Sequence, residues 1–152
     1  MFDPNEFLQE TYEGSHDTKL INPEDNMAGD GYQALIKKVD IRSWQKKDDP
    51  SVAGLALDLQ WEILDEDVKR FCNRDVVIVK QGIMLDLTDA GRLDMARGKN
   101  VALGRLREAL DMNQDGQPFS FSMLEGSMAN VFVQHRIHDD NIYAEVKRVA
   151  KL

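Results

Sequence analysis

A strict alternation of apolar and polar residues in the middle of the chain is the feature that most constrains its fold. Single small or polar residues separate five large apolar ones, which are Leu55, Leu57, Leu59, Trp61 and Ile63. Successive side chains of a β-strand point to opposite faces, so a period of two predicts a half-buried strand. Trp61 shares the parity of the apolar residues, and we therefore assign it to the core.

Four other segments are predicted to be strands. They are residues 32–44, 76–87, 129–137 and 142–150. In the first segment apolar residues occur in both parities, and a bulge near residues 36–38 would reconcile the two faces. Gly82 is a candidate bulge or kink in the second segment, and the last two are joined by the compact turn HDDN.

Residues 99–111 are predicted to be the helix of the chain. Val101, Leu103, Leu106 and Leu110 give a rough helical apolar face, with Asn100 as a cap after a turn at Gly98. Residues 65–75 are instead predicted to be a charged loop, with Phe71 and Cys72 underneath. The predicted order is therefore three strands, one helix and two strands.

This order is that of the OB-fold, a small Greek-key barrel. The expected fold class is mainly β, an OB-fold-like five-stranded Greek-key barrel with one helix between strands 3 and 4. The face of strands 2 and 3 in that fold, together with flanking loops, binds oligonucleotides or oligosaccharides. A generic α+β sandwich is the structural alternative.

The charge of the chain is concentrated at its beginning. The 152 residues have a formal net charge of −8, which by itself argues against a polyanionic partner. Residues 1–30, however, hold eight acidic residues and one basic residue, whereas the other 122 hold 19 acidic and 18 basic residues. We therefore divide the chain into an irregular acidic arm, residues 1–30, and an OB-fold-like domain, residues 31–152.

Basic residues gather in two stretches of the nearly neutral domain. One surrounds Trp44 at residues 37–47, and the other runs from Arg92 to Arg107. Basic residues interleaved with aromatic ones are typical of surfaces that bind a single-stranded backbone and stack its bases. A solvated surface of mixed charge is the alternative interpretation.

Several other classes of protein are not indicated. Cys72 is the one cysteine, which excludes an intrachain disulfide and a cysteine-based metal cage. No apolar stretch reaches the roughly 18 residues that span a bilayer, and the first ten residues are acidic, unlike a signal peptide. We therefore expect no association with a membrane.

The sequence also lacks recognisable catalytic or metal-binding motifs. There is no phosphate-binding loop, nucleophile elbow or Cys/His cluster, so we expect neither an enzyme nor a cofactor. His135 and His138 would point to opposite faces of a strand, and His135 is expected to be partly buried and hydrogen-bonded. Residues 111–116 match half of a calcium loop, but Ser122 stands where the loop needs a bidentate Glu.

Four motifs resemble a family of bacteriophage proteins with an OB-like fold, some of which are named single-stranded DNA-binding proteins. The motifs are GYQALI at 31–36, LDLQWEI at 57–63, GKNVALGRLREA at 98–109 and LEGSMANVFV at 124–133. The resemblance covers roughly residues 31–150, and its specific part is the helix-start motif. It implies binding of single-stranded DNA during phage replication or recombination in the cytoplasm of the infected bacterium, without catalysis.

The chain departs from this family at its ends. Many such proteins end in an acidic tail that recruits replication partners, whereas this chain ends in EVKRVAKL and carries its acidic excess at the other end. That the arm takes the place of the tail is a hypothesis.

Candidate DNA-binding residues are basic or aromatic side chains in loops or on strand faces opposite the core parity. Phosphates would be neutralised by the basic residues, and bases would stack on the aromatic rings. Tyr32 is left open between core and surface. The candidates are Trp44, Lys46, Lys47, Lys80, Arg92, Arg97, Lys99, Phe132, Arg136, Tyr143 and Lys147.

The favoured function is sequence-nonspecific binding of single-stranded DNA. The alternative is a protein-interaction or scaffold module whose acidic arm mimics nucleic acid or recruits phage or host replication or recombination proteins. A carbohydrate-binding barrel is a distant third. The sequence leaves both a monomer and a dimer open.

Overall fold

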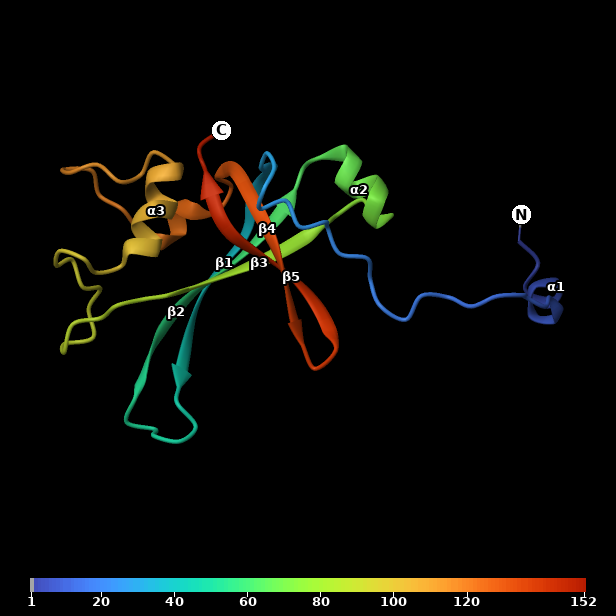
Figure 1. Cartoon of the computed structure of the whole chain (residues 1–152), viewed down its shortest axis with the longest axis horizontal. Coiled ribbons are helices and arrows are strands. Elements are labelled where there is room, and N and C mark those ends of the chain that lie inside the picture. Colours follow the sequence, from blue (N-terminus) through green and yellow to red (C-terminus); the bar gives the residue numbers. More distant parts are fainter. Residues whose placement is uncertain (1) are drawn as a thin grey trace.

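A computed structural model describes residues 2–152 and shows a mainly β protein (Figure 1). The strands are β1 (Tyr32–Gln45), β2 (Ala53–Ile63), β3 (Ile78–Met84), β4 (Met128–His138) and β5 (Asn141–Ala150). The helices are α1 (Pro4–Gln9), α2 (Glu66–Cys72) and α3 (Val101–Ala109), with a short 3-10 turn, η1 (Phe121–Leu124). Within residues 2–152, no helix is both long and apolar enough to cross a membrane.

The five strands form one mixed sheet that closes on itself. Their order around the ring is β1-β2-β3-β5-β4, and pairing between β1 and β4 completes it. Four of the junctions are antiparallel. The fifth, between β3 and β5, is parallel and consists of the single pair Lys80 and Glu145. The ring is therefore weakest between β3 and β5.

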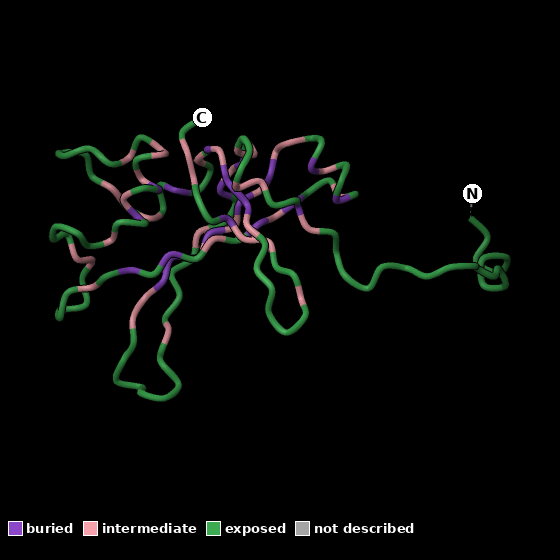
Figure 2. Tube along the Cα trace, in the orientation of Figure 1, coloured by how far each residue is buried: buried purple, intermediate pink, exposed green. Residues whose placement is uncertain are grey.

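The predicted alternation of β2 is confirmed and supplies the centre of the core. Leu57, Leu59, Trp61 and Ile63 are at most 1% exposed. The Nε1 of Trp61 donates a hydrogen bond to Oε1 of Gln81 at 2.9 Å, so the indole brings no unsatisfied donor into the core. Figure 2 shows that the buried residues of the chain, in purple, are concentrated where the strands converge.

The bulge predicted near residues 36–38 is present. The register between β1 and β2 shifts between Ile36 and Lys38, which leaves Lys37 as an extra residue. Ile36 then lies opposite Trp61 and Val39 opposite Leu59, so both parities of β1 reach the core face. The bulge predicted at Gly82 is wrong, because β2 and β3 pair without a shift past this residue.

The charged loop predicted at residues 65–75 is wrong, since α2 occupies most of it. Oδ1 of Asp65 accepts hydrogen bonds from the backbone N–H groups of Asp67 and Val68, at 2.9 and 3.3 Å, and caps the helix. Val68 and Cys72, four residues apart, are buried on one face. Phe71 lies on another face and is exposed, contrary to the prediction.

The helix predicted at residues 99–111 is confirmed as α3, in a shorter form. Leu103 and Leu106 are buried, but Val101 is half exposed, so the apolar face is narrower than predicted. Asn100 is at the N-cap position but makes no side-chain hydrogen bond to the helix. Its side chain instead binds the loop before the helix.

The N-terminal arm has two parts with different surroundings. Residues 2–18 are exposed and run away from the ring, with α1 among them (Figures 1 and 2). The following residues pack on β4, where Pro23 is buried. The Asn26 N–H donates to the Val133 carbonyl at 3.0 Å, and Asn26 Oδ1 accepts from the Val133 N–H at 2.6 Å. The detached, acidic part of the chain is therefore shorter than residues 1–30.

Candidate nucleic-acid interface

Two long hairpins extend from the ring toward the same side (Figure 1). The β1–β2 hairpin turns through residues 46–52 and is closed by a hydrogen bond from the Lys46 N–H to the Val52 carbonyl at 2.9 Å. The β4–β5 hairpin turns at Asp139 and Asp140, whose φ angles of 49° and 63° are both left-handed, as a type I′ turn requires.

Trp44 lies on the β1–β2 hairpin and packs against the opposite strand. It pairs with Gly54, and its indole lies so close that a Cβ atom on Gly54 would be 2.9 Å from Cζ2. The side chain is half-buried, and Nε1 is buried without a hydrogen-bond partner within residues 2–152. Lys46 and Lys47 follow it directly and are exposed.

Arg136 and Tyr143 form a cross-strand pair on the β4–β5 hairpin. The Arg136 guanidinium carbon lies 5.2 Å from the centre of the Tyr143 ring, within the range of a cation–π contact. Its Nε also lies 3.5 Å from Oε2 of Glu145. The aromatic surface and the positive charge of this pair are thus partly engaged inside the protein.

Acidic residues neutralise most of the basic residues near Trp44 on the outer surface of β1 and β2. Arg42 Nε lies 2.7 Å from Asp58 Oδ2, and the Asp58 carboxylate raises the pKa of Arg42. Lys37 and Lys38 pair with Glu62 and Asp40, at 2.9 and 3.5 Å. The basic stretch at residues 37–47 is therefore less positive than its sequence indicates.

Three of the candidate lysines, two at the β1–β2 turn and one on β3, make no ion pair within the part of the chain that the structure describes. Lys46 and Lys47 are at the β1–β2 turn, and Lys80 is exposed on β3. Lys80 is also the residue through which β3 joins β5. The charges of these three lysines are therefore not neutralised by a described carboxylate.

The predicted exposure of Phe132 is wrong. By alternation with the buried Val131 and Val133, its side chain points to the outer face of β4, but Phe132 is only 7% exposed. The guanidinium of Arg148 lies 3.9 Å above the centre of the ring, and the backbone at Gly31 abuts its edge. Phe132 is covered by its own protein and offers no free face for stacking.

Lys147 is separated from the other candidates by a bulge in β5. Phe132 pairs with Arg148 and Val133 with Val146, which leaves Lys147 as an extra residue. Alternation along β5 predicts one face for Tyr143 and Lys147, and the register is regular from Tyr143 to Val146 and shifts at Lys147 itself. Lys147 instead lines a pocket next to α3.

Arg92, Arg97 and Lys99 lie on a separate loop between β3 and α3. All three are exposed, and the loop is closed by a bridge between Leu87 and Leu93. Asn100 fixes its ends with a set of hydrogen bonds that the sequence analysis missed. Asn100 Oδ1 accepts from the Asp86 N–H at 2.8 Å, and Nδ2 donates to the carbonyls of Asp86 and Asp94, both at 2.9 Å.

The hydrogen bonding expected for His135 is confirmed, although the residue is exposed rather than partly buried. Its Nε2 lies 2.6 Å from the Pro23 carbonyl oxygen. His138 faces Asp139 at 3.3 Å, and Asp111 of the calcium-like segment pairs with Lys151 at 2.7 Å. Between residues 2 and 152, no three His, Cys, Asp or Glu side chains are grouped as ligands for a metal.

Five of the eleven candidate residues lie on the two hairpins, and a sixth lies on β3 at its junction with β5. Trp44, Lys46 and Lys47 are on the β1–β2 hairpin, Arg136 and Tyr143 are on the β4–β5 hairpin, and Lys80 is on β3. Tyr32, which the sequence left open, is half-buried, and its hydroxyl donates to the Glu24 carbonyl at 3.1 Å. Comparison of the chain with protein-family models, curated proteins and solved structures found no match.

Proposed function

We propose that this protein binds single-stranded DNA without sequence preference, as an OB-fold protein without catalytic activity. The observation that carries the proposal is the ring order β1-β2-β3-β5-β4, with two long hairpins on one side that bear aromatic and basic residues. An OB-fold binds oligonucleotides on the face of its second and third strands, between the β1–β2 and β4–β5 loops. The ring and hairpins fit that description, and the Greek-key barrel is part of the proposal.

The setting that we propose follows the resemblance to phage proteins. The protein would cover or organise single-stranded DNA during phage replication or recombination, in the cytoplasm of the infected bacterium. Phage or host replication or recombination proteins are its proposed further partners. The four sequence motifs at residues 31–133 support this setting.

The geometry supports a binding mode with few phosphate contacts. Lys46, Lys47 and Lys80 neutralise backbone phosphates, while Trp44 and Tyr143 offer ring faces to bases, each worth about 1–3 kcal/mol. Three neutralised phosphates correspond to a slope of about −2 in a plot of log affinity against log salt concentration. The affinity is therefore modest and falls as salt rises.

Tryptophan fluorescence tests the proposal directly. Oligo-dT should quench Trp44 in a saturable titration, and Trp44→Phe should remove the quenching because Trp61 is buried in the core. Repeating the titration at several salt concentrations gives the slope. An intact protein that shows neither quenching nor a gel shift at about 50 mM salt, where phosphate contacts are strong, would contradict the proposal.

A second candidate function is a protein-interaction module, and the detached arm favours it. Residues 2–18 contain five acidic side chains and no Lys or Arg. Phe2, Phe7, Leu8 and Tyr12 are exposed among them, between 61% and 94%. Apolar side chains between carboxylates suit a partner with a basic, partly apolar surface.

Pull-down from infected cells separates the two functions. The interaction module should capture a replication or recombination protein in a manner that depends on Phe7 and Tyr12, and it should be indifferent to free oligonucleotides. The DNA-binding protein should respond to oligonucleotides whether or not Phe7 and Tyr12 are replaced by Ser. Capture that survives both replacements would contradict a role of the arm.

A further inference from the structure

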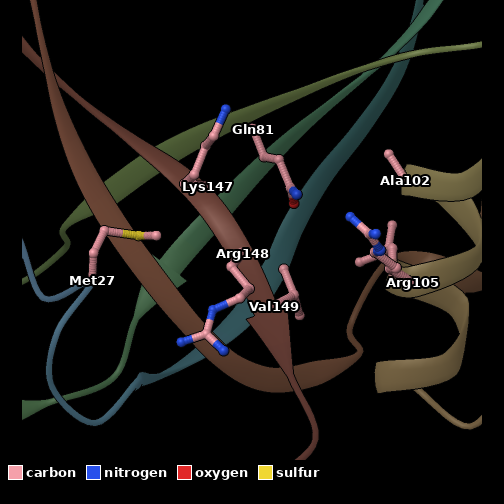
Figure 3. Close-up of a pocket in the computed structure, with 8 residues that line it drawn as sticks. Met27, Gln81, Ala102, Arg105, Lys147, Arg148 and Val149 are labelled. Carbon is pink, nitrogen blue, oxygen red and sulfur yellow. The ribbon is translucent and has the colours of Figure 1, made fainter.

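A pocket of about 320 Å³ lies between α3 and β5 (Figure 3). The part of β5 that lines it begins at Lys147 and continues through Arg148 and Val149, beyond the hairpin residues. Ala102, Leu106, Val149 and Met27 form its apolar walls. The pocket opens where the ring is weakest, because the described pairing between β3 and β5 is limited to Lys80 and Glu145. Its size is at the lower end of the range for small-molecule sites.

Gln81 contributes a polar group whose orientation is fixed. Its Oε1 accepts the hydrogen bond from Trp61 Nε1 in the core, so the amide oxygen is engaged there. The Nε2 group, a donor of two hydrogen bonds, is left for the pocket. Gln81 is half-buried, and Trp61, its partner, is fully buried.

Arg105 contributes the second polar group, and it is also a pure donor. Figure 3 shows its guanidinium on α3 and the Gln81 amide turned toward the same space beside Val149. Lys147 and Arg148 extend away from that space in the same view, and the Arg148 guanidinium covers Phe132. The pocket therefore combines apolar walls with side-chain groups that donate hydrogen bonds.

We infer that this pocket receives one nucleobase of the bound single strand and recognises it by carbonyl oxygens, as thymine presents them. This inference rests on the proposed function. The apolar walls suit the faces of a planar base, and the donors of Gln81 and Arg105 suit O2 and O4 of thymine. Adenine has no carbonyl oxygen, and beside its ring-nitrogen acceptors it carries the N6 amino group, a donor, which would face these donors unfavourably.

Lys80 brings the proposed strand to the outer face next to the pocket. Gln81 follows it in β3 but points to the inner face, where its amide oxygen accepts from Trp61. A strand held at Lys80 would therefore reach Gln81 by inserting a base through the gap between β3 and β5, where the described pairing is limited to Lys80 and Glu145. The preference concerns one base position, so it raises the affinity for thymine-rich strands without making the binding specific for a sequence.

The test compares the affinities for oligo-dT and oligo-dA in three variants of the full chain. Gln81→Glu keeps an oxygen to accept from Trp61 but replaces the donor in the pocket by an acceptor. Arg105→Gln removes the guanidinium from an exposed position of α3. Gln114→Glu is the matched control, because it adds the same charge at an exposed loop residue outside the pocket.

The expected result is that Gln81→Glu and Arg105→Gln each lower the dT/dA affinity ratio by roughly five- to tenfold, while Gln114→Glu leaves it unchanged. The melting temperature of each variant establishes that it is folded. If both pocket variants bind DNA with the wild-type ratio, the pocket is not a base site, although the proposed function stands. If the wild-type protein binds neither oligonucleotide, both proposals are wrong.

Discussion

The absence of a side chain at Gly54 allows the position of Trp44, because the indole lies only 2.9 Å from where a Cβ atom on residue 54 would be. Gly54→Ala should push the ring away from β2, since a contact of 2.9 Å is too short for two carbon atoms. We expect a shift of the Trp44 emission and a several-fold loss of oligo-dT affinity, measured by fluorescence titration. Stacking worth about 1–3 kcal/mol sets the upper limit of that loss.

Gly104→Ala is the matched control for this prediction. A Cβ atom on Gly104 meets nothing within 4 Å, and the residue is inside α3. Alanine should therefore raise the free energy of unfolding by about 0.5–1 kcal/mol and leave Trp44 emission unchanged. Wild-type emission and affinity in Gly54→Ala would show that Gly54 does not position the indole.

Asp25 makes the attachment of the arm sensitive to acid. Its pKa is lowered in the folded protein, first because the Met27 N–H donates to its carboxylate and second because the His135 N–H does so, at 3.0 and 3.3 Å. A lowered pKa stabilises the folded state above the unfolded pKa, about 3.9 for Asp, and this stability is lost as the pH falls through the folded value.

Asp25→Asn should therefore lower the melting temperature at pH 7, by an amount that shrinks as the pH falls below about 4. Thermal unfolding followed by circular dichroism at a series of pH values measures this difference. Asp17→Asn, on the detached part of the arm, should behave like the wild type throughout. An equal loss in Asp25→Asn at pH 7 and pH 3 would contradict a role of the charge.

At the scale of the elements, the sequence predicted what depends on local alternation. The parity of Leu55–Ile63 identified β2, and the mixed parity of residues 32–44 required the bulge at Lys37. Phe132 could not be predicted, because parity gives the direction of a side chain but not what covers it. Arg148 and Gly31, which cover its ring, become neighbours only through the register of β4 with β5 and β1.

The candidate site was also predicted only in part, because local sequence predicts exposure on a turn but not contacts that depend on strand register. Lys46 and Lys47 are on a turn, where exposure follows from local sequence. Whether the charge of Arg42 is neutralised could not be predicted, because that depends on the register of β1 and β2. Arg42 lies opposite Ala56, and Asp58, two residues further along β2, is then close enough to form the ion pair. The helix α2 was missed because only Val68 and Cys72 face the core, too few residues to show a helical period.

Asn100 holds the basic loop before α3 in place, and it does so in a left-handed conformation with a φ of 54°. Asn100→Ala removes three side-chain hydrogen bonds and places a less tolerant residue at that φ. We expect a loss of about 2–3 kcal/mol in the free energy of unfolding, measured in urea. Lys99→Ala, at the exposed neighbouring position, should cost less than about 0.5 kcal/mol.

At the scale of the whole molecule, the net negative charge is divided between the detached part of the arm and the rest of the chain. Deleting residues 2–18 removes five acidic side chains and brings the formal net charge from −8 to −3. These residues are exposed throughout, so the melting temperature should not change. Deleting residues 2–26 instead should cost roughly 2–4 kcal/mol, because the hydrogen bonds of Asn26 with Val133 and the burial of Pro23 are lost.

Thermal unfolding of both truncated proteins and of Asn26→Ala measures this difference. Asn26→Ala should reproduce part of the loss seen on deleting residues 2–26, since it removes the side-chain half of the contact with β4. If the two truncations have the same melting temperature, the packing of residues 19–26 contributes nothing to stability.

The attachment of residues 19–26 also fixes where the detached arm begins. Lys19 hydrogen-bonds to Asn141, and the Asn22 amide donates to the Ile142 carbonyl at 3.0 Å, so the arm starts at the β4–β5 hairpin. Phe7 and Tyr12 lie twelve and seven residues before Lys19, and a flexible chain of those lengths would have a root-mean-square reach of roughly 13–21 Å. A protein captured at Phe7 or Tyr12 would therefore stay beside the hairpins at an effective concentration in the millimolar range. Even a partner that binds the arm weakly would then encounter DNA bound at the hairpins far more often than it would by free diffusion.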